Sequence, residues 1–305
     1  MTAAGNLLSS IGNTPLVELT NMRPKNGARI LLKLEGSNPG ESVKDRTAKW
    51  MITHAIEDGR LKRGMTILEA TSGNTGIGLA MVGAALGYRT LLAIPEGASQ
   101  ERKHTLMAMG AQLIETPAEK GTDGAIEEVE KLREEETRKG TNRFFIPDQY
   151  ANHSNWLSHY ESTAVEILSQ TKGNIQAFVA GMGTGGTLMG HARRFRDEGK
   201  SINVMGVQPE PGHSIQGLKN MTESRMPGIF KQDELTSIIT RSDQQAFSTT
   251  QLLAREEGLF TGMSTGAAVS AALELAKTME STDTIVAISP DRGDRYLSTG
   301  VFRGA

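Results

Sequence analysis

The chain of 305 residues contains no cysteine, which excludes disulfide bonds and thiolate metal sites. Aromatic residues make up only 5% and the net charge is −2, so no basic, aromatic-rich surface for nucleic acid is expected. The longest near-apolar run, 77–86, is far below the ~20 residues needed to cross a bilayer. The N-terminus lacks the pattern of a signal peptide, and the six histidines show no metal-ligand spacing. We expect a soluble, cytoplasmic protein without a metal and without nucleic-acid or membrane partners.

What the chain does contain is a regular alternation of strand-like and helical segments. Strand patterns occur at 30–34, 66–69, 90–94, 112–115, 143–146, 177–180, 203–207 and 284–288. Helical patterns occur at 75–86, 99–109, 122–139, 154–169, 186–197, 242–257 and 264–277. Short strands separated by helices favour an α/β fold with parallel sheets covered on both faces. Two such series predict two lobes, with a ligand in the cleft between them.

The segment before the first long helix places a lysine in an unusual position. Apolar residues recur at i, i+3 and i+4 from Ala48 to Ile56, which predicts a helix that Gly59 closes. Ser42 can serve as its N-cap, so Lys44 falls in the first turn. Because a helix N-terminus is electropositive, this position favours the neutral amine, which can form a Schiff base with an aldehyde. A lone lysine at a helix start is more often simply solvated, so other motifs must support this interpretation.

A first polar loop, Thr71-Ser72-Gly73-Asn74-Thr75-Gly76, lies between a predicted strand and an apolar helix. Its hydroxyls, its amide and the backbone N–H groups at the helix start suit a carboxylate or a phosphate. The same residue types are also compatible with simple helix capping.

A second loop, Gly181-Met182-Gly183-Thr184-Gly185-Gly186-Thr187, follows an apolar strand and opens a helix. Its glycines let backbone N–H groups close around an anion, which predicts phosphate binding. The loop also spells G-x-G-x-x-G, the dinucleotide fingerprint, for which Glu210 is the only candidate acidic partner. A nicotinamide-binding protein is therefore an alternative hypothesis.

A third turn, Gly262-Met263-Ser264-Thr265-Gly266-Ala267, places a hydroxyl where it could cap the next helix. Together, an aldehyde-accepting lysine, a phosphate loop and a hydroxyl for a ring nitrogen match pyridoxal 5'-phosphate. A serine opposite the pyridine nitrogen is a weak acid and makes the ring a weaker electron sink than a carboxylate would. This favours rapid loss of a β leaving group over transamination.

Five ordered motifs resemble those of fold-type II pyridoxal-phosphate enzymes, most closely the cysteine synthases (O-acetylserine sulfhydrylases) of the B type. These motifs are 11–16, 38–46, 71–76, 183–187 and 262–266, and 208–210, 227–230 and 291–302 are similar to the B type in particular. The resemblance implies a two-lobed fold like the tryptophan synthase β chain, with the active site in the interlobe cleft. It implies a smaller, mobile domain at 41–150 and a larger cofactor-binding domain at 1–40 and 151–305.

The resemblance also implies roles for individual residues. Lys44 would hold the cofactor aldehyde and move the substrate's α proton, Asn74 would bind the ring oxygen, and Ser264 would face the pyridine nitrogen. The phosphate would be bound by Gly183, Thr184, Gly185, Gly186 and Thr187. The substrate carboxylate would be held by Thr71, Ser72, Gly73, Thr75 and Gln149.

The implied reaction makes L-cysteine from O-acetylserine and sulfide by a ping-pong β-replacement. B-type relatives also accept thiosulfate, but Lys219-Asn220 stands where an arginine pair is typical and Pro290 where cysteine is common. A homodimer and docking of a serine acetyltransferase are further implications. Alternatives within enzymes are a cystathionine β-synthase-like activity and a serine/threonine dehydratase.

Overall fold

The computed structural model describes residues 6–71 and 73–302. Contacts divide this part of the chain into two compact units, the smaller formed by 6–11 and 44–155 and the larger by 12–43 and 156–302. Residues 6–11 group with the smaller unit, because Leu8 and Ile11 enter its core. The sequence-based division into 41–150 and 1–40 with 151–305 stays a prediction.

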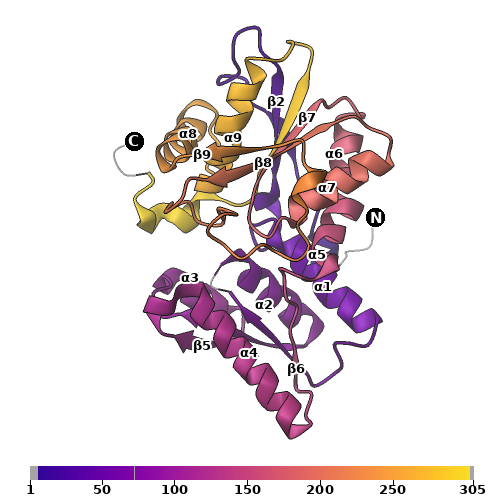
Figure 1. The fold of residues 1–305 in the computed structure, drawn as a ribbon, viewed down its shortest axis with the longest axis vertical. Coiled ribbons are helices and arrows are strands. Elements are labelled where there is room, and N and C mark those ends of the chain that lie inside the picture. The colour runs from indigo at the N-terminus through magenta and orange to yellow at the C-terminus, as the bar shows by residue number, and fades with distance from the viewer. Residues whose placement is uncertain (1–5, 72, 303–305) are drawn as a thin grey trace. The chain divides into compact units, whose positions relative to one another are not determined.

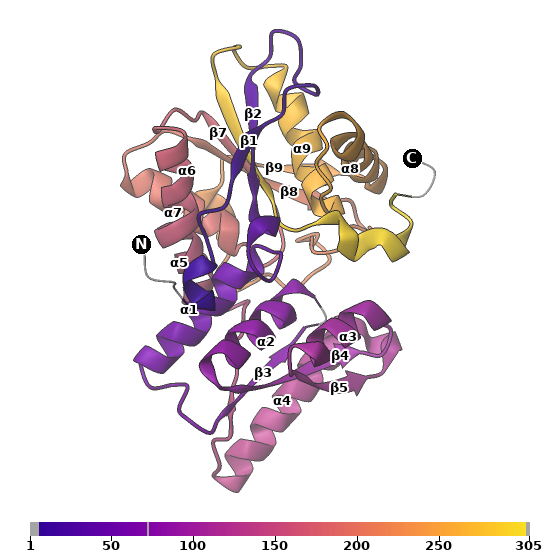
Figure 2. The same ribbon diagram turned by 180° about the vertical axis from the view of Figure 1, so that it is seen from behind.

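The larger unit contains a six-stranded sheet in the order β1-β2-β10-β7-β8-β9. The bounds are β1 Leu16–Glu18, β2 Arg29–Leu34, β7 Ala177–Gly181, β8 Asn203–Pro209, β9 Ser237–Arg241 and β10 Thr284–Ser289. Neighbouring strands are parallel except for β1, which runs antiparallel to β2 (Figure 2). The strands expected near 30, 177, 203 and 284 are confirmed, whereas the edge strands β1 and β9 were not predicted.

Helices cover both faces of this sheet. They are α6 Ala164–Gln170, α7 Gly186–Asp197, α8 Asp243–Glu256 and α9 Met263–Ala276. Ala177 and Val179 of β7 pack with α8 and α9, while Phe178 and Ala180 pack with α6 and α7. Figure 1 shows the two helix pairs on opposite sides of the strands. This alternation explains why the β7 sequence is apolar throughout.

The smaller unit contains a parallel sheet in the order β5-β4-β3-β6. Its strands are β3 Thr66–Ala70, β4 Arg89–Pro95, β5 Gln112–Thr116 and β6 Phe144–Phe145, and its helices are α1 Lys44–Glu57, α2 Asn74–Leu86, α3 Gln100–Ala108 and α4 Gly121–Lys139. Apolar side chains of α1 and α2 pack around Ile67 on one face of the sheet. Those of α4 pack against Leu68 on the other face. The α/β class with mainly parallel, helix-covered sheets is confirmed.

The predicted helix 154–169 is interrupted. It consists of α5 His153–Ser158, a π-helical turn His159–Thr163 and α6. Short 3₁₀ helices occupy Leu7–Ser10, Glu35–Ser37, Ala118–Lys120, Gln232–Glu234 and Gly293–Thr299. Among the described helices none is long and apolar enough to span a membrane.

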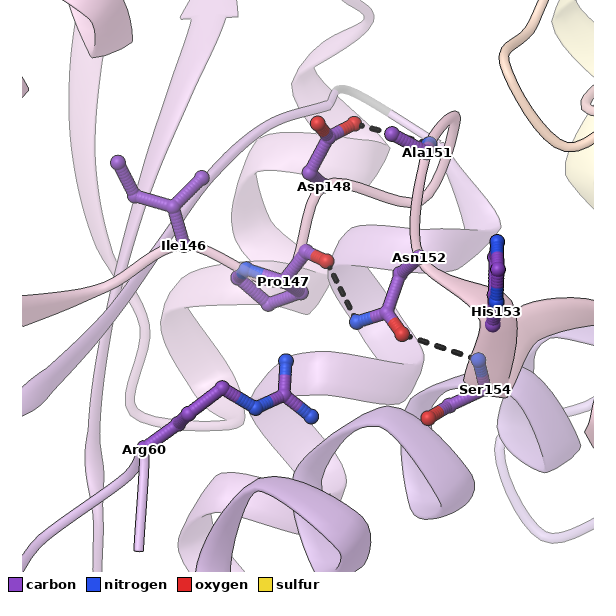
Figure 3. Close-up of a pocket in the computed structure, with 8 residues that line it drawn as sticks. All are labelled: Arg60, Ile146, Pro147, Asp148, Ala151, Asn152, His153 and Ser154. Carbon is purple, nitrogen blue, oxygen red and sulfur yellow. Dashed lines mark hydrogen bonds between the residues drawn. The ribbon is translucent and has the colours of Figure 1, made fainter. Parts of the chain in front are cut away.

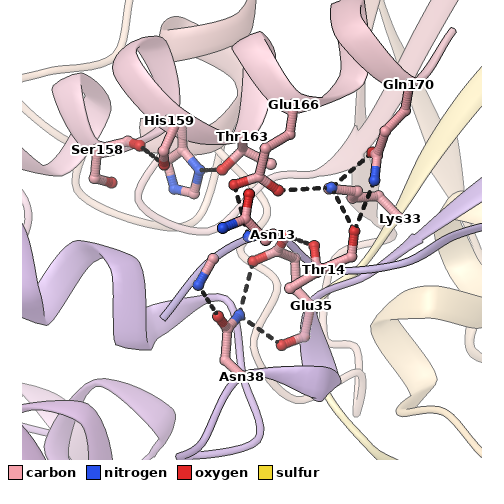
Figure 4. Close-up of polar contacts among 12 residues, drawn as sticks. Asn13, Thr14, Lys33, Glu35, Asn38, Ser158, His159, Thr163, Glu166 and Gln170 are labelled. Carbon is pink, nitrogen blue, oxygen red and sulfur yellow. Dashed lines mark hydrogen bonds and ion pairs between the residues drawn. The ribbon is translucent and has the colours of Figure 1, made fainter. Parts of the chain in front are cut away.

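A buried polar network fixes the start of the larger unit (Figure 4). The Lys33 ammonium group is fully buried and lies 2.7 Å from the Glu166 carboxylate. It also donates to the Thr14 carbonyl and to the Gln170 side chain. The Asn38 amide donates to the Glu35 carboxylate and carbonyl and to the Ser42 carbonyl. The network therefore orders the segment that leads to Lys44.

Candidate active site

Lys44 is the first residue of α1, which confirms its predicted place in the first helical turn. The helix packs closely on α2 at Gly78, where an added Cβ would lie 3.1 Å from the Lys44 carbonyl oxygen and 3.0 Å from Ala48 Cβ. Asn74 lies four residues before Gly78, which places it one turn earlier on the same side of α2. The start of α1 is therefore held beside the first turns of α2.

The loop before α2 leads from β3 to a glycine N-cap. Gly73 occupies that position in an extended conformation and makes no side-chain cap. Its N–H donates to Thr71 Oγ1 over 3.3 Å. Ser72 lies outside the described residues. Because the N-cap residue has no side chain, the interpretation of this loop as a simple hydroxyl cap is not supported at that position.

Thr75 and Gln149, both predicted to hold the substrate carboxylate, are brought together in the smaller unit. The Thr75 hydroxyl donates to Gln149 Oε1 over 2.7 Å, and both side chains are only 4% exposed. Asn155 Nδ2 donates to the Gln149 carbonyl. Asp148 before it adopts a left-handed conformation with φ 49° and accepts from the Ala151 N–H. A tight turn thus presents Gln149 to α2.

Figure 3 shows this turn beside a pocket of the smaller unit. The pocket is lined by Arg60, residues 146–148 and residues 151–154. Asn152 bridges the turn, because its amide donates to the Pro147 carbonyl and its oxygen accepts from the Ser154 N–H. These bonds rigidify the backbone on either side of Gln149.

In the larger unit the glycine loop connects β7 to α7. Gly185 is the N-cap of α7 with φ +81°, a conformation that favours glycine. An added Cβ there would lie 2.6 Å from Phe230, and one at Gly183 would lie 2.9 Å from the Gly217 carbonyl oxygen. The first turn of α7 contains no acidic residue. This loop therefore fits an anion bound by backbone N–H groups.

The remaining members of the loop have defined contacts. The Gly186 N–H donates to Thr184 Oγ1 over 3.4 Å, and Thr187 Oγ1 lies 3.3 Å from His159 Nε2. His159 is buried and also contacts Thr163 Oγ1.

Ser264 lies in the first turn of α9, in the larger unit, and is 4% exposed. The N-cap of α9 is Gly262, which makes no side-chain cap, so the prediction of a hydroxyl cap at this turn is wrong. An added Cβ at Gly262 would lie 2.1 Å from Asp291 Oδ1, which explains why a glycine starts the helix. The Ser264 hydroxyl is thus buried without a capping role.

Sequence reasoning missed one buried acid of the smaller unit, Glu69, which is 4% exposed. Burial, and next the Asp148 carboxylate, raise the pKa of Glu69 to about 8, although hydrogen bonds from Asp148 and Gln149 lower it. The signal was present, because Glu69 is the one charged residue in the apolar β3 strand Thr66–Ala70.

A lysine at a helix start suits an aldehyde, and a glycine loop at a helix start suits a phosphate. The chain belongs to the pyridoxal-phosphate-dependent enzyme family, whose profile matches residues 7–291. It is therefore an enzyme that uses pyridoxal phosphate. The match favours this cofactor over the nicotinamide alternative for the glycine loop.

Comparison with individual relatives narrows the class of pyridoxal-phosphate enzyme. The chain is 45% identical to cysteine synthase B of Escherichia coli, over 97% of this chain and 95% of that protein. It superimposes on the cysteine synthase of Entamoeba histolytica with a TM-score of 0.93 and 40% identity, covering 99% and 91% of the two chains. It is also similar to the O-acetylserine-dependent cystathionine β-synthase of Helicobacter pylori, with a TM-score of 0.90, 35% identity and coverage of 99% and 100%.

Proposed function

We propose that this chain synthesises L-cysteine from O-acetyl-L-serine and sulfide by β-replacement. The relatives named cysteine synthase match it over nearly its whole length. The observation that carries the proposal is the close packing of α1 on α2, which puts Lys44 next to the helix start that bears Asn74 and Thr75. The lysine that bonds to the cofactor and the loop that binds the substrate carboxylate then act on the same substrate molecule.

When bound, pyridoxal phosphate supplies an electron sink for charge that develops at the substrate's α carbon. Lys44 would hold the cofactor aldehyde and would move the α proton. Asn74 would bind the ring oxygen, and Ser264 would bind the ring nitrogen. The phosphate would be bound by Gly183, Thr184, Gly185, Gly186 and Thr187.

The substrate carboxylate is held by the loop before α2 and by the turn at Gln149. The residues in this role are Thr71, Ser72, Gly73, Thr75 and Gln149. Hydrogen bonds within the smaller unit order Thr75 and the turn at Gln149, so little conformational entropy remains to be lost there on binding.

We further propose sulfide rather than thiosulfate as the sulfur donor. The Asn220 amide is buried, donates to the Pro209 carbonyl and accepts from Thr222, so it serves the local turn. The Arg292 and Arg295 guanidinium groups lie 4.0 and 3.7 Å from the Glu41 carboxylate. Glu41 partly cancels the positive charge that a dianionic donor would need.

Three finer proposals remain: a cytoplasmic location, expected from the sequence patterns above, and a homodimer and docking of a serine acetyltransferase, both implied by the resemblance. Size-exclusion chromatography with light scattering, alone and with that enzyme, tests the last two.

Product analysis tests the activity. The purified protein with pyridoxal phosphate should make cysteine from O-acetylserine and sulfide, with a kcat/KM well above that for thiosulfate. Cystathionine as the main product when homocysteine is supplied would favour the cystathionine β-synthase alternative instead. Keto acid from serine alone would indicate a dehydratase.

A further inference from the structure

The chain segment that follows β10 lies along the residues that lead into α9, within the larger unit. Three backbone contacts join the two segments: the Gly293 N–H donates to the Phe260 carbonyl, Thr261 pairs with Arg292 in an antiparallel bridge, and the Gly262 N–H donates to the Asp291 carbonyl. The segment is also fixed from another direction, because the Pro290 carbonyl accepts from the Val43 N–H over 2.8 Å. It therefore offers a rigid support to the start of α9.

A buried carboxylate of this segment closes over the glycine before α9. The Tyr296 hydroxyl donates to Asp291 Oδ2 over 2.5 Å, and the two side chains are 4% and 2% exposed. Asp291 Oδ1 lies 2.1 Å, and Tyr296 Cε2 2.6 Å, from the place where a Cβ on Gly262 would begin. Because the tyrosine holds one carboxylate oxygen, it fixes the rotation that places the other oxygen against Gly262.

A second contact lies on the other side of Ser264 in the chain. Thr265 Oγ1 is 3.1 Å from Oγ of Ser289, the last residue of β10, and both side chains are buried. Gly262 and Thr265 are thus both held by residues 289–296, and Ser264 lies between them. We call residues 289–296 the α9 clamp.

The first turn of α9 needs such outside contacts. Gly262 is its N-cap and makes no side-chain cap. A glycine is also the residue with the greatest backbone freedom to lose on folding. Hydrogen bonds weaken steeply when donor and acceptor are misaligned, so a small rotation of this turn would weaken a bond from the Ser264 hydroxyl to a ligand.

We propose that the α9 clamp positions the Ser264 hydroxyl for its bond to the pyridine nitrogen. Tyr296 acts through the Asp291 carboxylate, which holds Gly262, and Ser289 acts on Thr265. Tyr296 and Ser289 are therefore positioning residues. The inference rests on the proposed function, since it requires Ser264 to bind the ring nitrogen.

The test uses the holoenzyme and Tyr296→Phe, which removes only the hydroxyl. The absorbance spectrum of the bound cofactor should change in the same direction as in Ser264→Ala. The kcat should fall roughly 2- to 12-fold, the range for one hydrogen bond, and no further than in Ser264→Ala. The amides of residues 262–266 should exchange their hydrogens faster, which is measured without any turnover.

Tyr160→Phe is the matched control, because the Tyr160 hydroxyl donates to Asp197 over 2.9 Å elsewhere in the larger unit. This variant also loses a tyrosine–aspartate bond, but it should leave the spectrum, the kcat and the exchange of residues 262–266 unchanged.

A double variant separates positioning from a general structural effect. If Tyr296 acts through Ser264, Ser264→Ala combined with Tyr296→Phe should have the kcat of Ser264→Ala alone. Independent effects would instead multiply.

Two results would overturn the inference: multiplied effects on kcat in the double variant, or an unaltered spectrum and kcat in Tyr296→Phe when Ser264→Ala changes both. If Tyr296→Phe does not fold, Ser289→Ala takes its place in every comparison, with the same expected and contradicting results. A spectrum and kcat that stay unaltered in Ser264→Ala itself refute the assignment of Ser264 to the ring nitrogen and the inference with it.

Discussion

The Lys33 ammonium group lies 2.7 Å from the Glu166 carboxylate, although the two residues are 133 positions apart in the chain. The first prediction follows from this pair. Lys33→Met should destabilise the protein by about 3–5 kcal/mol, because it leaves a carboxylate without its partner in a largely buried place. Urea unfolding measures the loss.

Lys103 provides the matched control for Lys33. It is also buried, but its partner Glu115 is 45% exposed and stays hydrated without it. Lys103→Met should therefore cost clearly less than Lys33→Met. Adding Glu166→Gln to Lys33→Met should restore part of the stability; no recovery would contradict the assigned pairing.

A second prediction concerns the glycine loop. Gly185→Ala should lower the stability by at least 1–2 kcal/mol, roughly the cost of the left-handed conformation. It should also weaken pyridoxal phosphate binding, because the new Cβ would lie 2.6 Å from Phe230. Gly199, with φ +66° and open space around it, separates the two effects. Gly199→Ala should lower the stability only by the cost of the left-handed conformation and should leave cofactor binding unchanged. Equal cofactor affinities of Gly185→Ala and Gly199→Ala would contradict the assignment of this loop to the phosphate.

A third prediction tests Ser264. Ser264→Ala should retain the cofactor, which the phosphate loop still holds, while kcat falls roughly 2- to 12-fold through loss of one hydrogen bond. Ser270 lies on the same helix and donates to the Ala267 carbonyl. Ser270→Ala should leave kcat unchanged. An unaltered absorbance spectrum and kcat in Ser264→Ala would place the ring nitrogen elsewhere.

A fourth prediction is a pH dependence of stability from Glu69. Its folded-state pKa is raised to about 8 from 4.5, chiefly by burial, so the folded protein holds this proton more tightly than the unfolded chain. The stabilisation of the folded state by this tightly held proton is fully present below pH 4.5 and is lost as the pH rises through 8. Relative to Glu69→Gln, the free energy of unfolding should fall with pH by up to about 1.4 kcal/mol per unit. A pH-independent difference would contradict the buried, neutral carboxyl.

Much of the fold could be predicted from the chain itself. The apolar runs of β7 and β10 and the 3.6-residue periodicity of α1 reflect burial that is local in sequence. The edge strands β1 and β9 are partly exposed along most of their length and depend on pairing with β2 and β8, so their patterns were weak. The π-helical turn at 159–163 has no simple sequence signature.

The site was less evenly predictable. Loops with glycines and hydroxyls at helix starts indicated ligand binding, because the residues that form each loop are consecutive in the sequence. Glu69 was missed although it is the one charged residue of β3. The Thr75–Gln149 bond was not predicted, since it depends on a turn 74 residues away from Thr75. The prediction of a hydroxyl cap at Ser264 was wrong because α9 begins at Met263, which makes Gly262 the N-cap.

The most direct test of the account is the site of covalent attachment of the cofactor. Borohydride reduction of the holoenzyme, followed by peptide mass mapping, should place the pyridoxyl label on Lys44 alone. Lys44→Ala should take up no label and lose cysteine formation, while the phosphate loop still binds the cofactor reversibly. A label on another lysine, or activity in Lys44→Ala, would contradict the account.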